Sequence, residues 1–149
     1  MKIVFDMDNT LTDDFGNRLR PGIEPLLKGL KKSGHTLVLW TNSERRRAKQ
    51  ILSHHDLTDF FSSFLFREDY DPHRKGLPKD IRTIDADLLV DDDPKQIAFV
   101  KSVGKEGFEI TPYRGRGMGG QRELQALQTL IKQMSKGGGF GAMLKRVLG

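Results

Sequence analysis

Short runs of β-branched and aromatic residues recur along the chain, separated by segments with a different hydrophobic spacing. Runs of about four to eight such residues, bounded by polar or turn-forming residues, are typical of buried strands. Five runs are predicted as strands: KIVFD (2–6), HTLVLWT (35–41), SSFLFR (62–67), ADLLVD (86–91) and GFEIT (107–111).

Between these runs, apolar residues recur every three or four positions, which predicts helices that bury one face. The recurring positions are Ile23, Leu26, Leu27 and Leu30; Ala48, Ile51 and Leu52; Ile97, Ala98, Phe99 and Val100; and Leu124, Leu127, Leu130, Ile131 and Met134. Strands that alternate with helices favour a parallel sheet, because parallel strands need crossover connections. We therefore predict a small doubly wound α/β domain, a three-layer sandwich with a five-stranded parallel sheet.

The pattern changes after Ser135. KGGGFG (136–141) predicts a flexible joint, because glycine-rich segments are conformationally free. We expect one domain over residues 1–134, and a glycine-rich joint with a short amphipathic tail over residues 135–149. Packing of this tail onto the domain is favoured over docking to a partner or a membrane surface, since ten residues make a marginal interfacial helix.

Composition limits the setting in which the protein works. The chain has 149 residues, 36% of them hydrophobic, which suffices for one sizeable core. It lacks both a run of about 18 apolar residues and the apolar stretch of a secretory signal, so we expect no transmembrane segment and a cytoplasmic protein. The absence of cysteine excludes disulfides, cysteine nucleophiles and thiolate zinc sites.

Charge is unevenly distributed. Lys and Arg outnumber Asp and Glu by 25 to 20, and the pI is about 9.6. This excess of positive charge favours anionic binding partners and gives weak support to nucleic acid as one of them. The basic run ERRRAK (44–49) is either a solvated helix face or, because it follows Thr-Asn-Ser, a contact for an anionic substrate. Arg114 and Arg116 are loop candidates for the same role.

Polar residues follow three predicted strands at the point where each strand ends. They are Asp6 and Asp8, Thr41 and Asn42, and Asp91 and Asp92. Ligands of doubly wound sheets bind outside the carboxyl ends of the strands, so we expect these side chains at one edge.

The acidic residues of this group predict a metal site. Residues i and i+2 of a strand point to the same side, so Asp6 and Asp8 share a small volume in which their charges repel. A divalent cation relieves this repulsion, and oxygen ligands are those that Mg²⁺ prefers. Asp93 precedes Pro94 and a helical pattern, and is predicted as a helix N-cap. The metal candidates are Asp6, Asp8, Asp91 and Asp92.

A phosphate beside such a metal needs further donors and cations. Thr41 and Asn42 offer a hydroxyl and amide groups at the end of the second strand. Lys75 and Lys79 both lie in HRKGLPKDI, just before the segment that leads to the fourth strand, and either could reach the site.

The segments FDMDNTL, LVLWTNS, RKGL and LLVDDDP, in this order, resemble the four motifs of the haloacid dehalogenase-like phosphohydrolase superfamily. The resemblance spans residues 1–134. It is strongest to the capless branch that holds the small C-terminal-domain phosphatases (NLI-interacting-factor-like) and the magnesium-dependent phosphatases. That branch has a lysine, in a KDL motif, sixteen residues before the first acid of the fourth motif. Lys75 lies sixteen residues before Asp91, so this spacing favours Lys75 over Lys79.

The resemblance implies a role for each matching residue. Asp6 is the implied nucleophile, forming an aspartyl-phosphate. Asp8 is the implied general acid and then base, with its backbone carbonyl on the metal. Thr41 and Lys75 are expected to hold the phosphoryl oxygens, and Asp92 is expected to bind Mg²⁺ together with the Asp6 carboxylate.

The spacing between motifs leaves no room for a folded cap domain. Residues 10–41 hold a short flap and one helix, and residues 42–75 hold a helix, a strand and a turn. An open site suits a phosphate on a macromolecule, and we expect a phosphoprotein as substrate. The alternatives are a phosphatase for nucleic-acid ends or for nucleotide or sugar phosphates, and a non-enzymatic phospho-switch or binding module. The sequence carries no signal of the oligomeric state.

Overall fold

The computed structural model of the protein describes residues 1–117 and 120–148, with side chains described as far as residue 137. Five parallel strands form one sheet in the order β3-β2-β1-β4-β5. The strands are β1 (Lys2–Phe5), β2 (Thr36–Trp40), β3 (Ser63–Leu65), β4 (Leu88–Asp91) and β5 (Glu106–Glu109). The predicted five-stranded parallel sheet is therefore confirmed.

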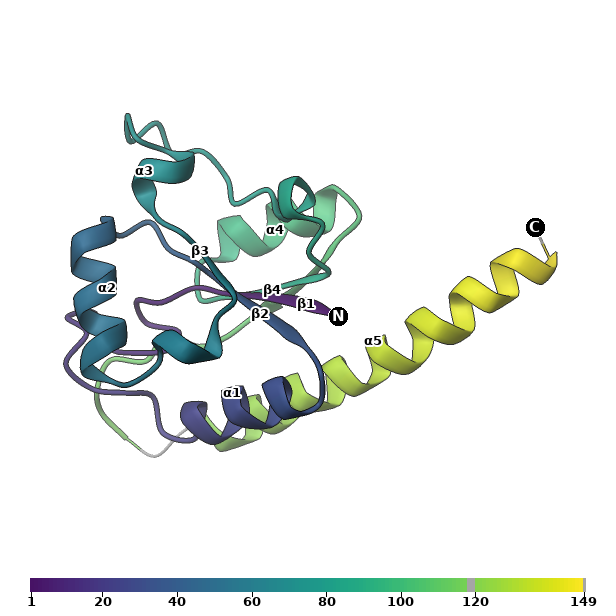
Figure 1. Cartoon of the computed structure of the whole chain (residues 1–149), viewed down its shortest axis with the longest axis horizontal. Helices are drawn as coiled ribbons and strands as arrows, with labels where there is room; N and C mark the ends of the chain where they lie inside the picture. Colours follow the sequence, from purple (N-terminus) through teal and green to yellow (C-terminus); the bar gives the residue numbers. More distant parts are fainter. Residues whose placement is uncertain (118–119, 149) are drawn as a thin grey trace.

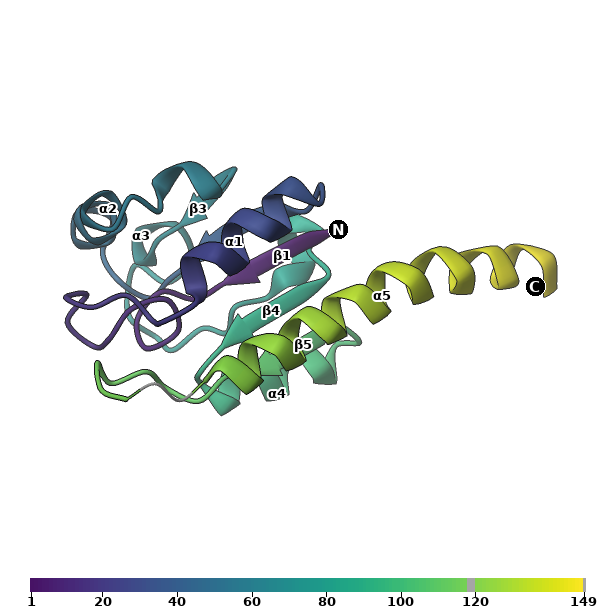
Figure 2. The ribbon, with the colours of Figure 1, turned by 90° about the horizontal axis from the view of Figure 1, so that it is seen from below.

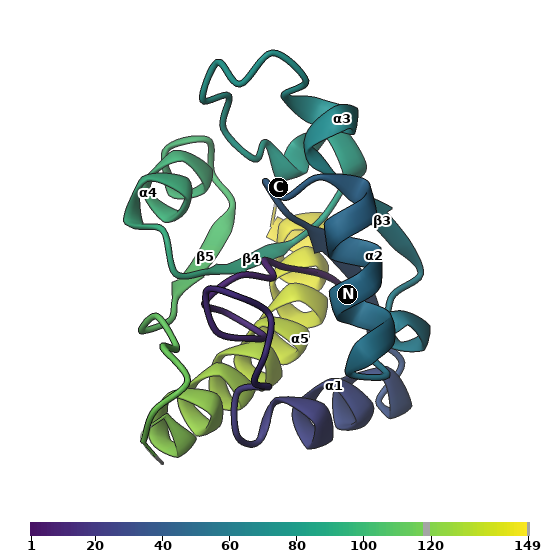
Figure 3. The same ribbon diagram turned by 90° about the vertical axis from the view of Figure 1, so that its left-hand side faces the viewer.

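Helices cover both faces of this sheet, as Figure 3 shows. They are α1 (Ile23–Lys32), α2 (Arg45–His54), α3 (Arg67–Tyr70), α4 (Pro94–Ser102) and α5 (Gln121–Leu148), with short 3₁₀ helices η1 (Thr58–Phe60) and η2 (Ile81–Ile84). In Figure 2, α1 and α5 lie in front of β1 and β4. The three-layer, doubly wound α/β architecture follows from this arrangement.

The core has one layer on each face, because successive strand residues point to opposite sides. Ile3 and Phe5 of β1 belong to the larger layer, which includes residues of α1, α2 and α5. Val4 belongs to the smaller layer, which includes Ile97 and Val100 of α4. Since the central strand is covered on both faces, it is hydrophobic throughout, and polar side chains begin only where it ends.

Two connections at the carboxyl edge of the sheet determine access to the site. The chain leaves β1 through a loop whose residues 9–20, here called the flap, make a bridge between Thr12 and Leu19 before α1 begins. The chain leaves β2 through a short connection, residues 41–44, that leads into α2. Neither described connection contains a folded cap, as the spacing predicts. The flap packs closely on α2: a Cβ on Gly16, whose φ is +72°, would lie 2.5 Å from Ile51 Cδ1.

The last helix continues through the predicted joint. Helix α5 spans Gln121–Leu148 without interruption, and Figure 1 shows it running past the edge of the domain. The predicted boundary between the domain (1–134) and the tail (135–149) therefore falls inside α5. The division of the chain into a domain and a tail stays a prediction. The side chains of residues 138–149, on which the predicted apolar face of the tail depends, lie outside the described residues. Over the part of the chain that the structure describes, no helix combines the length and the apolar character needed to cross a membrane.

Candidate active site

The carboxyl ends of β1, β2 and β4 meet around a cleft of about 530 Å³. Six of the predicted site residues line this cleft: Asp6, Asp8, Thr41, Asn42, Asp91 and Asp92. Adjacent parallel strands end side by side, which is why residues 85 positions apart in the sequence share one volume. Asp93 also behaves as expected, because its side chain accepts a hydrogen bond from Lys95 N and Pro94 opens α4.

Lys79 is the lysine of this cleft, and the preference for Lys75 is corrected. Lys79 Nζ lies 2.8 Å from Asp6 Oδ1 and 2.7 Å from Asp91 Oδ2, and the side chain is 4% exposed. Lys75 is exposed and does not line the cleft.

The reason for this placement is the path of the chain after α3. The buried carboxylate of Asp71 accepts hydrogen bonds from the backbone N–H groups of Lys75, Gly76 and Leu77. This turn holds the Lys75 backbone near Asp71 while its side chain stays in solvent, and the chain reaches the cleft at Lys79. A signal for Lys79 was present in the letters KDI (79–81), which share Lys and Asp with the KDL motif, whereas KGL (75–77) shares Lys and Leu and has the expected spacing.

The electrostatics of the cleft are dominated by buried carboxylates. Burial raises the pKa of Asp6 from 3.8 to about 6, although the Lys79 ammonium acts to lower it. Burial, reinforced by the Asp6 charge, likewise raises the pKa of Asp91 to about 6. Burial also raises the pKa of Asp92. Burial alone would lower the pKa of Lys79, but the two carboxylates together raise it above its ordinary value.

The donor set of the cleft fits a hard divalent cation. Asp6, Asp91 and Asp92 each offer a carboxylate oxygen, and these oxygens lie within 4.8 Å of one another. Three carboxylates face one buried ammonium, so a further positive charge is needed to offset them, and all the donors are oxygens. The Asp8 carboxylate is not in this group, because it faces Arg47 instead. The expectation that its backbone carbonyl binds the metal stays a prediction.

The segment after β2 places polar side chains in the cleft, and their predicted role in binding a phosphoryl group stays a prediction. The Thr41 side chain is buried, and its hydroxyl oxygen accepts a hydrogen bond from Ser43 N at 3.0 Å. This contact uses only an oxygen lone pair, so the hydroxyl can still donate a hydrogen bond. Asn42 is exposed beside it and lines the same cleft.

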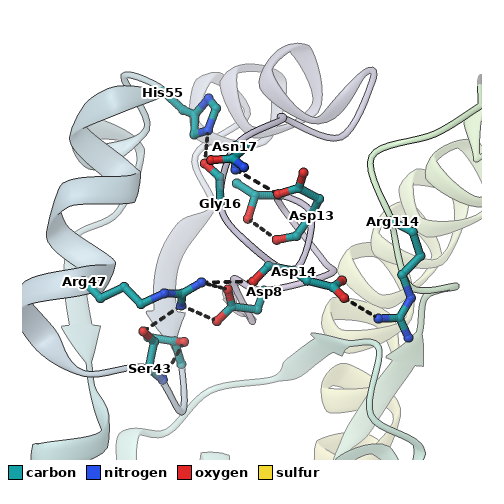
Figure 4. Close-up of polar contacts among 11 residues, drawn as sticks. Asp8, Asp13, Asp14, Gly16, Asn17, Ser43, Arg47, His55 and Arg114 are labelled. Atoms are coloured by element: carbon teal, nitrogen blue, oxygen red, sulfur yellow. Dashed lines mark hydrogen bonds and ion pairs between the residues drawn. The ribbon is translucent and has the colours of Figure 1, made fainter.

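Arg47 of α2 is a site residue that the sequence left undecided within ERRRAK. Its guanidinium makes a two-pronged ion pair with Asp8, with NH2–Oδ1 at 2.9 Å and NH1–Oδ2 at 3.0 Å (Figure 4). Arg114, predicted as a substrate contact, forms an ion pair with Asp14 of the flap at 2.8 Å. Arg67 lines the cleft without having been predicted. Charge runs alone do not indicate which member of the run faces a site.

Comparisons with known proteins agree with this geometry. A sequence model of the family described as "NLI interacting factor-like phosphatase" matches residues 1–140. No curated protein matches the chain. Among solved structures, the chain is similar to a haloacid dehalogenase-superfamily hydrolase from Ehrlichia chaffeensis, with a TM-score of 0.61, 14% identity, and coverage of 87% of this chain and 97% of that one.

Two further structures share the fold. One is a D,D-heptose 1,7-bisphosphate phosphatase from B. bronchiseptica in complex with magnesium and phosphate, with a TM-score of 0.57, 18% identity, and coverage of 85% and 87%. The other belongs to a Pnkp1/Rnl/Hen1 complex, with a TM-score of 0.57 and 18% identity. That match covers 77% of this chain but about half (47%) of the other. Identities this low show the fold alone, whereas the family match extends over nearly the whole chain. The protein therefore belongs to the NLI interacting factor-like phosphatase family.

Proposed function

We propose that the protein is a Mg²⁺-dependent phosphomonoester hydrolase that works through an aspartyl-phosphate on Asp6. The observation that carries the proposal is the position of the Asp6 carboxylate. It is bound by the Lys79 ammonium at 2.8 Å and by the Thr10 hydroxyl at 3.1 Å, and it lies in the same cleft as Thr41 and Asp8. A carboxylate held by donors on both oxygens is fixed in direction, as an in-line attack on phosphorus requires.

The reaction has two steps. Asp6 takes the phosphoryl group from the substrate, and water then removes it from Asp6, while Asp8 acts first as an acid and then as a base. A carboxylate oxygen of Asp6 attacks phosphorus, the bond to the leaving oxygen breaks, and Asp8 gives that oxygen a proton. Water then attacks the phosphorus of the aspartyl-phosphate while Asp8 takes a proton from the water. Inorganic phosphate leaves and the Asp6 carboxylate is restored. The Thr41 hydroxyl and the Lys79 ammonium bind the phosphoryl oxygens as their charge is redistributed.

Asp6 and Asp92 are the side chains proposed to hold Mg²⁺. Asp6 is proposed because its carboxylate must also reach the phosphorus, and each of its oxygens keeps a lone-pair site beyond its hydrogen bond. Asp91 is the most buried of the three acids at 1% exposed, and it accepts hydrogen bonds from Lys79 Nζ and, at 3.0 Å, from Asp93 N. Among the described residues, the half-buried Asp92 side chain accepts one long contact of 3.4 Å, from the Thr10 hydroxyl, so its oxygens are the more available. When bound, Mg²⁺ supplies the positive charge that lets two anions, carboxylate and phosphate, approach each other.

The proposed substrate is an exposed phosphate of a macromolecule, such as a phosphoprotein. The cleft is open, and no cap over it is found in the described part of the chain, so a bulky leaving group can extend into solvent. Phosphorylated nucleic-acid ends are the second candidate, because Arg47 and Arg67 line the cleft. The expectation of a cytoplasmic protein stays a prediction.

A substrate screen tests the proposal. The purified chain is incubated with p-nitrophenyl phosphate, phosphopeptides, nucleotides and 3′- or 5′-phosphorylated oligonucleotides, with Mg²⁺ or with a chelator. We expect turnover only with Mg²⁺, and loss of turnover in Asp6→Asn protein that keeps the wild-type melting profile. Phosphate release at wild-type rates from Asp6→Asn would remove the proposed nucleophile. A stable phosphorylated protein without turnover would instead support the phospho-switch.

A further inference from the structure

Arg47 joins three segments of the chain that meet beside the cleft (Figure 4). Its NH1 group donates to Asp8 Oδ2 at 3.0 Å and to Ser43 Oγ at 2.9 Å. Its NH2 group donates to Asp8 Oδ1 at 2.9 Å and to the backbone carbonyl of Asp14 at 3.0 Å. One side chain of α2 thus contacts the connection between β2 and α2, the residue proposed as general acid, and the flap.

The flap that Arg47 contacts is anchored at other points as well. Asp14 Oδ2 accepts a hydrogen bond from Arg114 NH1 at 2.8 Å, which ties the flap to the segment between β5 and α5. The Gly16 carbonyl lies 2.7 Å from His55 Nε2, at the C-terminal end of α2. The Asp14 carbonyl therefore belongs to a segment held from both sides, and it is a fixed acceptor for the Arg47 guanidinium.

The arrangement fixes the direction of Asp8 more than it stabilises the fold. The Arg47 and Asp8 side chains are 42% and 28% exposed, and partly exposed ion pairs contribute about 0–1 kcal/mol. Two parallel hydrogen bonds nevertheless fix the plane of a carboxylate, which one bond does not. A carboxyl group offers about four lone-pair sites, so this pairing leaves a site on each oxygen where Asp8 can carry the proton that it gives to the leaving oxygen and later takes from water.

We propose that Arg47 is a positioning residue, which directs the Asp8 carboxylate at the leaving-group oxygen and couples that direction to the flap. This inference rests on the proposed function, in which Asp8 exchanges a proton with that oxygen. It assigns a purpose to the first turn of α2. Because the described residues form no cap over the cleft, a fixed side chain would provide the orientation that a closing lid provides in other enzymes.

The test compares two substrates that differ in their need for a proton. p-Nitrophenyl phosphate releases a stable phenolate, whereas an alkyl phosphate such as a phosphoserine peptide must have its leaving oxygen protonated. The ratio kcat/KM is measured, because it reports the steps up to departure of the leaving group and excludes the later attack by water. We expect Arg47→Ala to lower kcat/KM for the phosphoserine peptide about 100-fold, the low end of what a positioned acid contributes. For p-nitrophenyl phosphate we expect a loss below about threefold, because nitrophenolate needs no acid.

Matched variants separate orientation from charge. Arg46→Ala removes the same charge from an exposed neighbour on α2 and should leave both substrates near wild-type rates. Arg47→Lys keeps the charge but cannot form the two-pronged pair, so it should resemble Arg47→Ala on the phosphopeptide. In an Asp8→Asn background, Arg47→Ala should add less than about a twofold loss, because residues that act as a unit are not additive. Thermal melts establish that each variant is folded.

The outcomes distinguish this inference from the proposed function on which it rests. If Asp8→Asn keeps its kcat/KM for the phosphopeptide, Asp8 is not the acid and the proposed function itself fails. If Asp8→Asn is impaired but folded Arg47→Ala and Arg47→Lys behave like Arg46→Ala, only the positioning role is overturned. Equal losses on both substrates, with weaker inhibition by inorganic phosphate, would mean that Arg47 binds the phosphoryl group directly, and this too overturns the inference. Additive losses in the Asp8→Asn background would do the same.

Discussion

Replacing Lys79 with methionine tests the charge balance on which the site depends. The substitution keeps an unbranched side chain of similar length but removes the ammonium that contacts Asp6 and Asp91. Both carboxylates are buried, so the variant leaves two buried negative charges without their partner. Removing one partner of a buried ion pair costs about 3–5 kcal/mol. For a domain of this size, that loss lowers the melting temperature by about 10 °C.

The sign of the pH dependence follows from the raised carboxyl pKa values. Asp6 and Asp91 have pKa values of about 6 in the folded protein against 3.8 ordinarily, and loss of Lys79 raises both further. The folded variant then binds more protons than the unfolded chain over the window from about pH 4 to above pH 6, so its stability falls as the pH rises through this window. We expect the deficit to be large at pH 8 and less than half as large at pH 5, where protons neutralise the carboxylates.

The assay is urea or thermal unfolding in a metal-free buffer, combined with turnover measurements in Mg²⁺. Lys75→Met is the matched control: it removes the same charge from an exposed position in the same segment and should change neither stability nor turnover. A Lys79→Met protein as stable as the wild type at pH 8 would contradict the reasoning. If Lys75→Met loses turnover and Lys79→Met does not, Lys75 is the lysine of the active site, as the motif spacing predicted.

Three further predictions concern the metal and the segment that carries Lys79. Mg²⁺ should raise the melting temperature at pH 7.5 by several degrees, since a ligand at about 100 times its Kd adds about 2.7 kcal/mol. The increase should be much smaller at pH 5, where Asp6 and Asp91 hold protons. Equal increases at the two pH values would count against a carboxylate site. Asp92→Asn should raise the Mg²⁺ concentration for half-maximal turnover at least tenfold, which a metal titration measures. Asp71→Ala should lower kcat about tenfold by releasing the turn before Lys79, and unchanged kinetics would show that this turn does not position the lysine.

The sheet was predictable because its determinants are local. Strand runs and helical spacings reflect burial of neighbouring residues, and parallel strands order their carboxyl ends at one edge. Asp6, Thr41 and Asp91 could therefore be placed together without coordinates. Lys79 could not, because its position depends on how Asp71 folds the segment that follows α3.

Arg47 shows the same limit for charge runs. The letters ERRRAK give three adjacent arginines without distinguishing the one that faces the cleft, since this depends on where α2 begins. Helix α2 begins at Arg45, and the side chains of its first turn point in different directions around the axis. Arg45 contacts Asp69 while Arg47 contacts Asp8, two positions apart in the sequence but in different surroundings. Only the three-dimensional arrangement separates these roles.

The energetics of the buried carboxylates give a reason for the acidic residues at the end of a hydrophobic strand. Asp6 directly follows Phe5, which is completely buried, and water is thereby excluded from one side of its carboxylate. Desolvation destabilises the ionised forms of Asp6 and Asp91, and Lys79 offsets this only in part, because their pKa values stay raised. The folded protein therefore gains free energy when another cation joins the cluster or when the phosphoryl group transfers charge away from Asp6. The same imbalance that weakens the fold at neutral pH would thus favour the proposed binding of Mg²⁺ and the proposed attack of Asp6 on phosphorus.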